Sequence, residues 1–530
     1  MIAENSGKQE GGETGSGWRP AVNPWIIAAV VMLATFMEIL DTTIVSVALP
    51  YVAGSLSAST DEATWTLTSY LVANAIILPA TGWLGRYFGR KRFLIYCIAI
   101  FSIASFFCGI ASNLGMLILA RVLQGAGGGA LQPISQAILL ESFPPEKRGM
   151  AMGAFGIGVV VAPILGPTLG GWLTDNYSWR WAFYMNIPVG ILAIFLIRTF
   201  VEDPPYIKDA KPGKTDNIGF GLMAVSLATL QVVLDKGQED DWFAASWVCW
   251  FVAISAASMI IFILWELRSD EPLVNLRVLK DRNFAVGTIL VTFFGVCLYS
   301  AITLIPLYLQ TLMGYTAMLS GLAMSPRGLG AMVAMPIVGI LMGKVDFRKV
   351  TATGFIVVAI SLWQFGAINL EISMWNIIMP NVLMGMGLSM IFVPLSAVSM
   401  GTLPREEIGN ASGIFNLMRN IGGSVGISVV TTLLVRRAQV HQSNLVSHLA
   451  PGDPSFQGSA RELGHAFRHF FNPYDATARA GGTLYNELIR QSTLMAFIDN
   501  FRLLAAVIML CVGAVLLFKK VKVHGPISAE

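Results

Sequence analysis

Two acidic residues, Glu38 and Asp41, lie within an apolar stretch that covers residues 25–49. A charged side chain in the interior of a bilayer costs roughly 2.5–3.5 kcal/mol on insertion scales, so such residues usually face a wet cavity and have a function. Their spacing of three places them as neighbours on one face of a helix. Two adjacent acids with little solvent do not both ionise readily, which is what a reversible proton carrier near neutral pH needs.

Arg121, in the apolar stretch 114–139, is the candidate counter-charge for Asp41. We expect this pairing to keep Asp41 ionised until a substrate or a conformational change separates the two side chains. The alternative is a static buried ion pair that locks two helices together. Other polar side chains in the apolar stretches are candidates for substrate binding: Asn74, Gln124, Asp235, Asn416 and Arg419. Asp235 ends its stretch and is equally explained as a solvated acid.

Patterns for enzymatic, nucleotide or metal chemistry are missing from the sequence. The segment Gly213-Lys214-Thr215 has Lys208 where a phosphate-binding loop needs its first glycine, so we expect no ATP site of that kind and no cofactor. His465 and His469 have a spacing that suits zinc on a helix, but no third ligand is evident. The five cysteines have no paired or metal-binding spacing and are interpreted as packing residues.

The composition indicates a polytopic, all-α integral membrane protein. Hydrophobic residues make up 55% of the 530 residues and charged residues 13%, against about a quarter in soluble proteins. A net charge of +3 without a long basic run argues against nucleic-acid binding. Crossing a bilayer takes about 20 apolar residues. Fourteen stretches meet this length: 25–49, 62–85, 93–112, 114–139, 149–173, 181–200, 217–235, 243–265, 284–311, 318–342, 350–369, 374–400, 408–435 and 496–518.

The distribution of lysine and arginine predicts the orientation. Most of the 35 basic residues fall in alternate connections, and the short connections on the other side contain only Arg180 and Lys236. Basic residues mark cytoplasmic connections, so both termini are predicted to be cytoplasmic. The polar segment before the first stretch lacks an apolar core and a cleavage site, and we expect no removable signal peptide.

Two segments 260 residues apart resemble each other. GMAMGAF from Gly149 matches GNASGIF from Gly409, and Gly125 and Gly127 match Gly385 and Gly387. Chance similarity between apolar segments is the alternative, but several pairs share one offset. A parallel duplication predicts two six-helix bundles around a central cavity, which transport by rocking. The predicted domains are an N-terminal tail (1–24), a first bundle (25–200), a linker with two inserted helices (201–282), a second bundle (283–518) and a C-terminal tail (519–530). The second bundle includes a long outward loop at 437–495.

Several motifs resemble the major facilitator superfamily, and in particular its fourteen-span drug:proton antiporters of the EmrB type. These motifs are LDTTIVSVALP (40–50), LARVLQGAGGGA (119–130), APILGPTLGG (162–171), SWRWAFYMNIPVG (178–190) and LDKGQEDDW (234–242). The resemblance covers essentially the whole chain. There are three departures: Arg86 stands where an acid is usual, Ala162 replaces a glycine, and Arg327 lies where many relatives are apolar.

The resemblance implies residues that control the conformational change. They belong to the basic turn GWLGRYFGRKR and to the antiporter motif: Gly82, Gly89, Arg90, Gly166, Pro167 and Gly170. The glycine-rich runs at 125–130 and 166–171 are expected to allow close helix packing, with a kink in the second.

The resemblance also implies a function, namely proton-coupled export of hydrophobic drugs across the inner membrane. It further implies a periplasmic adaptor of EmrA type and an outer-membrane channel as partners. The segments ARELGHAFRHFF and GGTLYNELIRQSTLMAFIDNF in the loop 437–495 are predicted helices that contact this adaptor or cover the permease as a lid. One alternative is transport of a defined metabolite such as a fatty acid or a siderophore. A membrane enzyme or an uncoupled channel is a more distant one.

Overall fold

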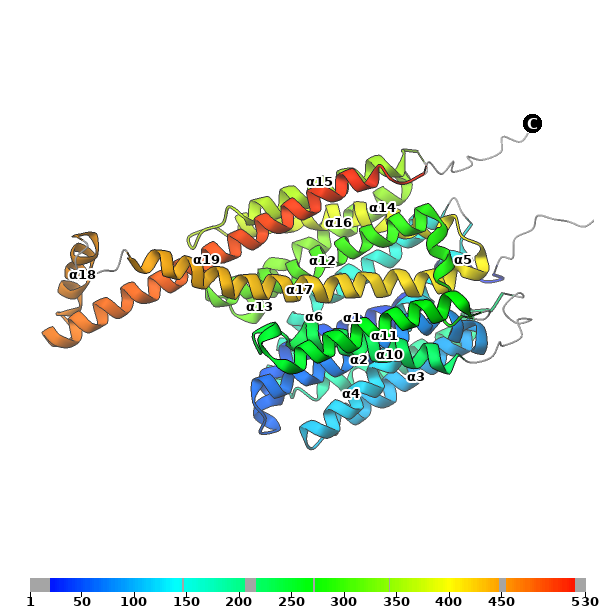
Figure 1. Ribbon diagram of the computed structural model, residues 1–530, viewed down its shortest axis with the longest axis horizontal. Helices are drawn as coiled ribbons and strands as arrows, with labels where there is room; N and C mark the ends of the chain where they lie inside the picture. The colour runs from blue at the N-terminus through cyan, green and yellow to red at the C-terminus, as the bar shows by residue number, and fades with distance from the viewer. Residues whose placement is uncertain are drawn as a thin grey trace, which may run out of the picture.

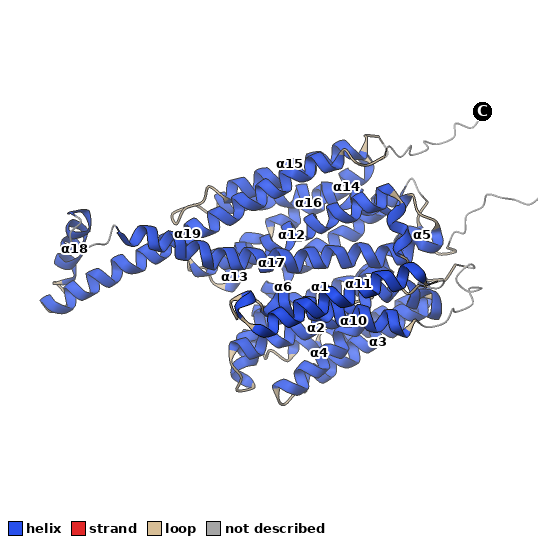
Figure 2. Ribbon diagram, in the orientation of Figure 1, coloured by secondary structure: helices blue, strands red, loops and turns tan. Residues whose placement is uncertain are grey.

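The computed structural model describes residues 20–144, 147–204, 216–269, 272–342, 344–447 and 454–519. Every regular element in these ranges is a helix (Figure 2). The first bundle contains α1 (Pro24–Ser55), α2 (Thr60–Phe88), α3 (Arg90–Gly109), α4 (Leu114–Gly128), α5 (Leu131–Ser142), α6 (Arg148–Asn176), α7 (Trp181–Tyr184) and α8 (Asn186–Phe200). The inserted pair is α10 (Asn217–Lys236) and α11 (Ser246–Arg268), with the short helix η2 (Trp242–Ala244) between them.

The second bundle follows a short helix, η3 (Leu276–Lys280). It contains α12 (Arg282–Thr311), α13 (Ala317–Met324), α14 (Pro326–Leu341), α15 (Phe347–Phe365), α16 (Trp375–Gly401), η4 (Arg405–Glu407), α17 (Ile408–Val446), α18 (Pro454–Phe467) and α19 (Pro473–Val515). Three of the predicted stretches are each divided between two consecutive helices: α4 and α5, α7 and α8, and α13 and α14.

Thirteen helical segments in the described part of the chain are long and apolar enough to cross a membrane. The remaining predicted stretch, 350–369, corresponds to α15, which has the basic pair Arg348 and Lys349 in its first turn. This helix packs against α16 and α19 like its neighbours in the bundle. The architecture is therefore the predicted one, an all-α membrane protein with two bundles and two inserted helices (Figure 1).

The 260-residue repeat reappears in the packing of its glycines. A Cβ atom on Gly127 would lie 2.8 Å from the Cys97 carbonyl oxygen on α3, and one on Gly387 would lie 3.0 Å from the Gly354 carbonyl oxygen on α15. A second repeat-related pair, Gly153 of α6 and Gly413 of α17, contacts the opposite bundle in the same way, on α14 and α2 respectively. Because glycine lets two helix backbones approach, equivalent glycines fix equivalent contacts in the two halves.

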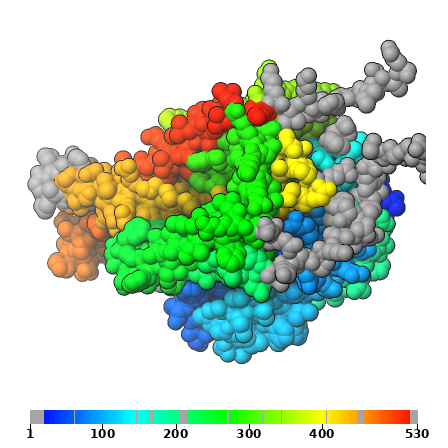
Figure 3. Space-filling view, turned by 45° about the vertical axis from the view of Figure 1, so that its right-hand side comes forward, coloured from blue at the N-terminus to red at the C-terminus, as the bar shows by residue number. Residues whose placement is uncertain are grey.

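The inserted helix α10 lies between the two bundles. Thr68 of α2 donates a hydrogen bond to Asp235 of α10. On its other side, the Gln231 Nε2 of α10 lies 3.0 Å from the Ser424 Oγ of α17. In the space-filling view, a green surface lies between the blue N-terminal part and the orange-to-red C-terminal part (Figure 3). The insertion therefore spans the junction between the two bundles.

The bundles touch at the end of the molecule where α1 begins and α19 ends, which we call the terminal end. A Cβ atom on Gly82 of α2 would lie 2.5 Å from the Cα atom of Asn410 on α17. On the opposite side of the junction, a Cβ atom on Gly339 of α14 would lie 2.8 Å from the Cα atom of Met150 on α6. These two backbone contacts hold the halves together at the terminal end.

At the opposite end of the molecule, the far end, the segment 437–495 is mostly helical. Helix α17 continues to Val446 and α19 begins at Pro473, so both membrane helices extend past the bundle, and α18 packs beside the start of α19 (Figure 1). His441 Nε2 on α17 lies 2.9 Å from Asp499 Oδ2 on α19 and ties the two extensions together. The two predicted helices are present, but as α18 and as a continuous part of α19 rather than as pieces of a loop.

Candidate functional site

Helix α1 carries both candidate proton-binding residues into the interior of the first bundle. The helix begins at Pro24, and proline suits this position because the first N–H groups of a helix have no partner within the helix. The Asn23 side chain accepts a hydrogen bond of 3.0 Å from the Trp25 N–H. Glu38 and Asp41 are 6% and 0% exposed. With a rise of about 1.5 Å per residue, they lie roughly 21 and 26 Å from the helix start, near the middle of this 32-residue helix.

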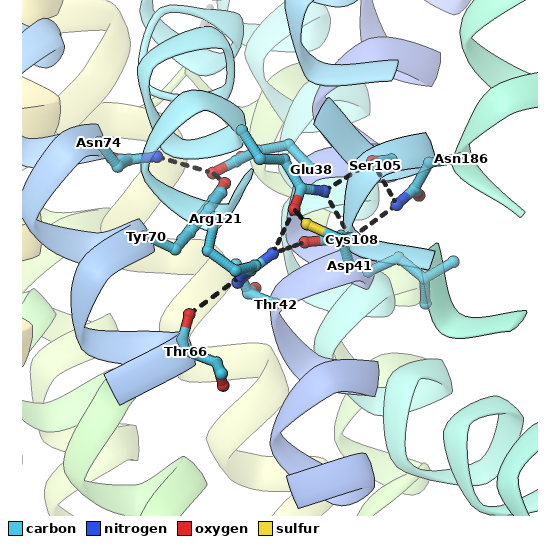
Figure 4. A network of polar contacts seen from close by, with 12 residues as sticks. Glu38, Asp41, Thr42, Thr66, Tyr70, Asn74, Ser105, Cys108, Arg121 and Asn186 are labelled. Carbon is cyan, nitrogen blue, oxygen red and sulfur yellow. Dashed lines mark hydrogen bonds and ion pairs between the residues drawn. The ribbon is translucent and has the colours of Figure 1, made fainter. Parts of the chain in front are cut away.

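Asp41 forms a fully buried ion pair with Arg121 of α4, the contact that the sequence predicted (Figure 4). The Arg121 Nη1 donates to Asp41 Oδ2 at 2.7 Å. The other carboxylate oxygen, Oδ1, accepts from Gln124 Nε2 at 2.9 Å and from Asn186 Nδ2 at 2.6 Å. Asp41 thus accepts three hydrogen bonds, one of them from a cation, as a buried carboxylate requires.

The surroundings of Arg121 hold its guanidinium in place. Its Nε donates to the Thr66 carbonyl oxygen at 3.0 Å and its Nη1 to Gln124 Oε1 at 2.7 Å. The guanidinium carbon lies 4.2 Å from the centre of the Tyr70 ring, in the geometry of a cation–π contact. The Nη2 atom is buried and has no hydrogen-bond partner. Neutral groups therefore hold the Arg121 guanidinium in place, and Asp41 is the one carboxylate that contacts it in the described part of the chain.

Glu38 has a different environment, because all its hydrogen-bond donors are neutral. Its Oε1 accepts from the Tyr70 hydroxyl at 3.2 Å and from Asn74 Nδ2 at 3.3 Å. Its Oε2 accepts from Gln132 Nε2 at 2.8 Å. Since Tyr70 also stacks on Arg121, the two acids belong to one connected network (Figure 4). One acid is balanced by a cation and the other is not, so the two are chemically inequivalent.

The predicted substrate-binding residues separate into three places. Asn74 and Gln124 are part of the network around the two acids. Asn416 and Arg419 lie on α17 at the junction of the halves, where they contact Gln136 and Gln132 respectively. Asp235 lies apart from both groups, on α10, where it accepts a hydrogen bond from Thr68.

The predicted gating residues lie at helix contacts. Arg90 forms a buried ion pair with Glu141 of α5. Gly89 separates α2 from α3 with a φ of +81°, a conformation that favours glycine, and the adjacent Lys91 N–H donates to Asp203 Oδ1 at 2.8 Å. Asp203, from the segment after α8, thus supplies an acid at this basic turn.

The remaining gating residues belong to α6, which runs without interruption from Arg148 to Asn176. Gly166 packs against Thr43 of α1, and a Cβ atom on Gly170 would lie 3.2 Å from the Cα atom of Ile44. The predicted close packing of this motif is therefore confirmed. The Pro167 side chain lies outside the described residues.

Several residues of the network escaped sequence-based prediction. Asn186 and Ser105 share hydrogen bonds with Asp41 and Gln124, and Gln132 joins Glu38 to Arg419. Asn186 does lie within the motif SWRWAFYMNIPVG, which was a usable signal. Ser105 and Gln132 are common residue types in membrane helices, and only the packing of the helices selects them.

Comparisons with known proteins agree with this architecture. The model of the Major Facilitator Superfamily matches residues 31–427. The multidrug export protein EmrB of Haemophilus influenzae is 38% identical over 440 residues, which cover 83% of this chain and 86% of that protein. The fatty acid resistance protein FarB of Neisseria gonorrhoeae is 38% identical over 432 residues, covering 81% and 85%.

Among solved structures, the human organic anion transporter MFSD10 superposes with a TM-score of 0.57 at 13% identity. The match covers 92% of this chain and 99% of that one. At this identity the likeness concerns the fold alone.

Proposed function

The chain belongs to the major facilitator superfamily and is an EmrB-type permease by sequence, and from this premise we propose that it exports hydrophobic drugs across the inner membrane in exchange for protons. The observation that carries the proposal is the buried Asp41–Arg121 pair next to Glu38, which has only neutral partners. Carboxylates inside a membrane are costly and are typical of proton pathways. A pair of acids with different partners can bind protons in separate steps.

The proposed cycle follows from the conformation and the orientation. The basic turns lie at the terminal end, which supports a cytoplasmic location for that end. The halves touch there, which supports assigning this conformation to the stage of the cycle in which protons enter from the outer side. Protonation of Asp41 and Glu38 favours outward drug release and the return to the inward-facing state. Loss of the protons to the cytoplasm resets the site, and Arg121 tunes how strongly Asp41 binds its proton.

The proposed substrates are lipophilic compounds of several classes, captured with low specificity. A cavity lined by apolar, aromatic and methionine side chains accommodates varied ligands. The alternative substrate is a defined metabolite such as a fatty acid or a siderophore, and one relative is named as a fatty acid resistance protein. The two possibilities are separated by the range of compounds transported.

The experiment uses the purified full-length chain in proteoliposomes with an imposed pH gradient. A lipophilic cationic dye, an uncharged dye and a long-chain fatty acid are each followed as they move against their own gradients. We expect both dyes to accumulate only when protons flow in the opposite direction. Movement of the fatty acid alone would favour the metabolite, and movement that ignores the pH gradient would contradict antiport.

We further propose that the far-end arm, formed by the ends of α17 and α19 together with α18, contacts a periplasmic adaptor of EmrA type that leads to an outer-membrane channel. Its support is the exposure of large aromatic side chains there: Phe470 is 82% and Tyr474 84% exposed. Exposed aromatic residues are typical of protein interaction sites.

The variant Phe470→Ser/Tyr474→Ser tests the adaptor contact. It should lose drug resistance in cells while keeping pH-driven transport in proteoliposomes. Loss of both activities would instead favour the alternative, in which this segment covers the permease as a lid.

A further inference from the structure

A row of polar side chains joins α5 of the first half to α17 of the second. Gln136 Oε1 accepts from Ser412 Oγ at 2.9 Å and from Asn416 Nδ2 at 2.7 Å. One turn earlier on α5, Gln132 Oε1 accepts from Arg419 Nη2. The spacing of four on α5, and of four and three on α17, keeps these residues on facing sides of the two helices. The row therefore forms a polar contact across the junction that must separate if the halves rock.

Arg419 brings an unbalanced charge into this contact. The side chain is 1% exposed, and its Nε and Nη1 atoms have no hydrogen-bond partner. Besides Gln132, its Nη2 has the Asn420 Oδ1 at 3.5 Å, and in the described part of the chain no carboxylate forms an ion pair with it. A buried cation without a counter-charge is strongly unfavourable. The negative charge that balances Arg419 must therefore act on it through an intervening group.

The link is the Gln132 amide, whose Nε2 donates to Glu38 Oε2 at 2.8 Å while its Oε1 accepts from Arg419. Glu38, Gln132 and Arg419 thus form a chain from a buried acid on α1 to a buried cation in the other half. We propose that Gln132 is the positioning residue that couples the charge on Glu38 to the polar contact between α5 and α17, and through this contact to closure at the terminal end. The proposal rests on the proton coupling proposed above and assigns to it a route.

The direction of the effect follows from what each group can donate or accept. An ionised carboxylate only accepts and a guanidinium only donates, so the amide satisfies both in one orientation, with Nε2 toward Glu38 and Oε1 toward Arg419. Protonation of Glu38 removes the charge-assisted bond, which is roughly twice as strong as a neutral one. Arg419 then loses the counter-charge that acts on it through Gln132, and the closed contact loses stability. Proton binding therefore favours opening at the terminal end, which is the step that a drug:proton antiporter needs after release.

The other titratable and charged groups near Glu38 do not replace this link. Asp41, on the same helix, is engaged by Arg121 of α4, and the Tyr70 phenol of α2 is itself a donor to Glu38. Further along α5, Glu141 is engaged by Arg90. Arg419 of α17 is thus the cation whose balance depends on Glu38.

The test measures the distance between the halves at the terminal end as a function of pH. Spin labels are placed at the exposed positions Arg92→Cys on α3 and Lys349→Cys on α15, one in each half, in a chain whose exposed Cys249 is replaced by serine. The full-length protein is studied in lipid nanodiscs by double electron–electron resonance. We expect the long-distance population to rise relative to the short one by about tenfold from high to low pH, within the 5- to 150-fold range of typical couplings.

Three variants on this background separate the possible outcomes. Glu38→Gln should favour the long distance at every pH. Gln132→Met, similar in size but without the amide, should reduce the tenfold response to less than about twofold. The matched control is Gln136→Met, which removes an amide from the same helix and the same contact but has no bond to Glu38, and it should keep the pH response.

A full pH response in Gln132→Met, an equal loss in Gln136→Met, or a wild type whose distances ignore pH would each overturn the proposed coupling. Efflux driven by a pH gradient is measured on the same proteins. It distinguishes a failure of the route through Gln132 from a failure of the proposed antiport function. If wild-type efflux depends on the gradient while Gln132→Met keeps its pH response, antiport stands and the route through Gln132 is wrong. If wild-type efflux ignores the gradient, the proposed function itself is wrong.

Discussion

Removal of one partner of the Asp41–Arg121 pair should cost far more stability than removal of a solvated charge. Both side chains are fully buried, with the Nη1 and Oδ2 atoms 2.7 Å apart. Asp41→Asn leaves the guanidinium without a carboxylate, and Arg121→Met leaves the carboxylate with neutral donors only. Breaking a buried pair from one side typically costs about 3–5 kcal/mol. We expect each single variant to lower the free energy of unfolding by that amount.

The double variant Asp41→Asn/Arg121→Met removes both charges together and should cost no more than either single change, because replacing a whole buried pair is often nearly neutral. The coupling energy from this double-mutant cycle should therefore have a magnitude of at least about 3 kcal/mol. Unfolding in mixed micelles, followed by tryptophan fluorescence, measures all the free energies.

The control is Glu487→Gln, because Glu487 pairs with Arg490 at 3.3 Å and both side chains are about half exposed, 47% and 48%. It should cost less than about 1 kcal/mol. Additive single and double variants, with a coupling energy near zero, would refute the reasoning, since they would show that the charges of Asp41 and Arg121 do not interact in the folded protein.

Two glycine substitutions give further tests, with Gly171→Ala as the shared control because no atom lies within 4 Å of its Cβ position. Gly82→Ala places a Cβ atom 2.5 Å from the Asn410 Cα atom, so it should force the halves apart at the terminal end and raise thiol labelling of cysteines introduced there. Gly125→Ala brings a Cβ atom against the Tyr70 carbonyl oxygen and should lower the free energy of unfolding by about 1–3 kcal/mol. Unchanged labelling or unchanged stability would contradict the respective packing argument.

The sequence predicted those features that depend on local composition or on repetition. Apolar length located the membrane helices, and the offset of 260 residues anticipated that Gly127 and Gly387 make equivalent contacts. The pairing of Asp41 with Arg121 was also predictable, because few charges occur inside the apolar stretches and opposite charges must meet there.

Other features depend on helix packing and left no local signal. Gln132 and Arg419 are 287 residues apart, and their contact exists because α5 packs against α17 across the junction. The segment near residue 480 contains Gly481 and Gly482, which are poor helix formers, and apolar length does not reveal that α19 begins at Pro473. Asp235 was considered a substrate contact, and its actual neighbour, Thr68, follows from where the inserted helix lies.

The most direct test of the central claim, that Asp41 carries a transported proton, compares wild type with Asp41→Asn in proteoliposomes that have an imposed pH gradient. We predict that wild type moves a lipophilic dye against its gradient only when protons flow the other way, and that Asp41→Asn exchanges the dye without responding to the gradient. Uphill, proton-driven transport by Asp41→Asn would contradict the claim, making Asp41 a structural partner of Arg121 and leaving Glu38 as the proton carrier.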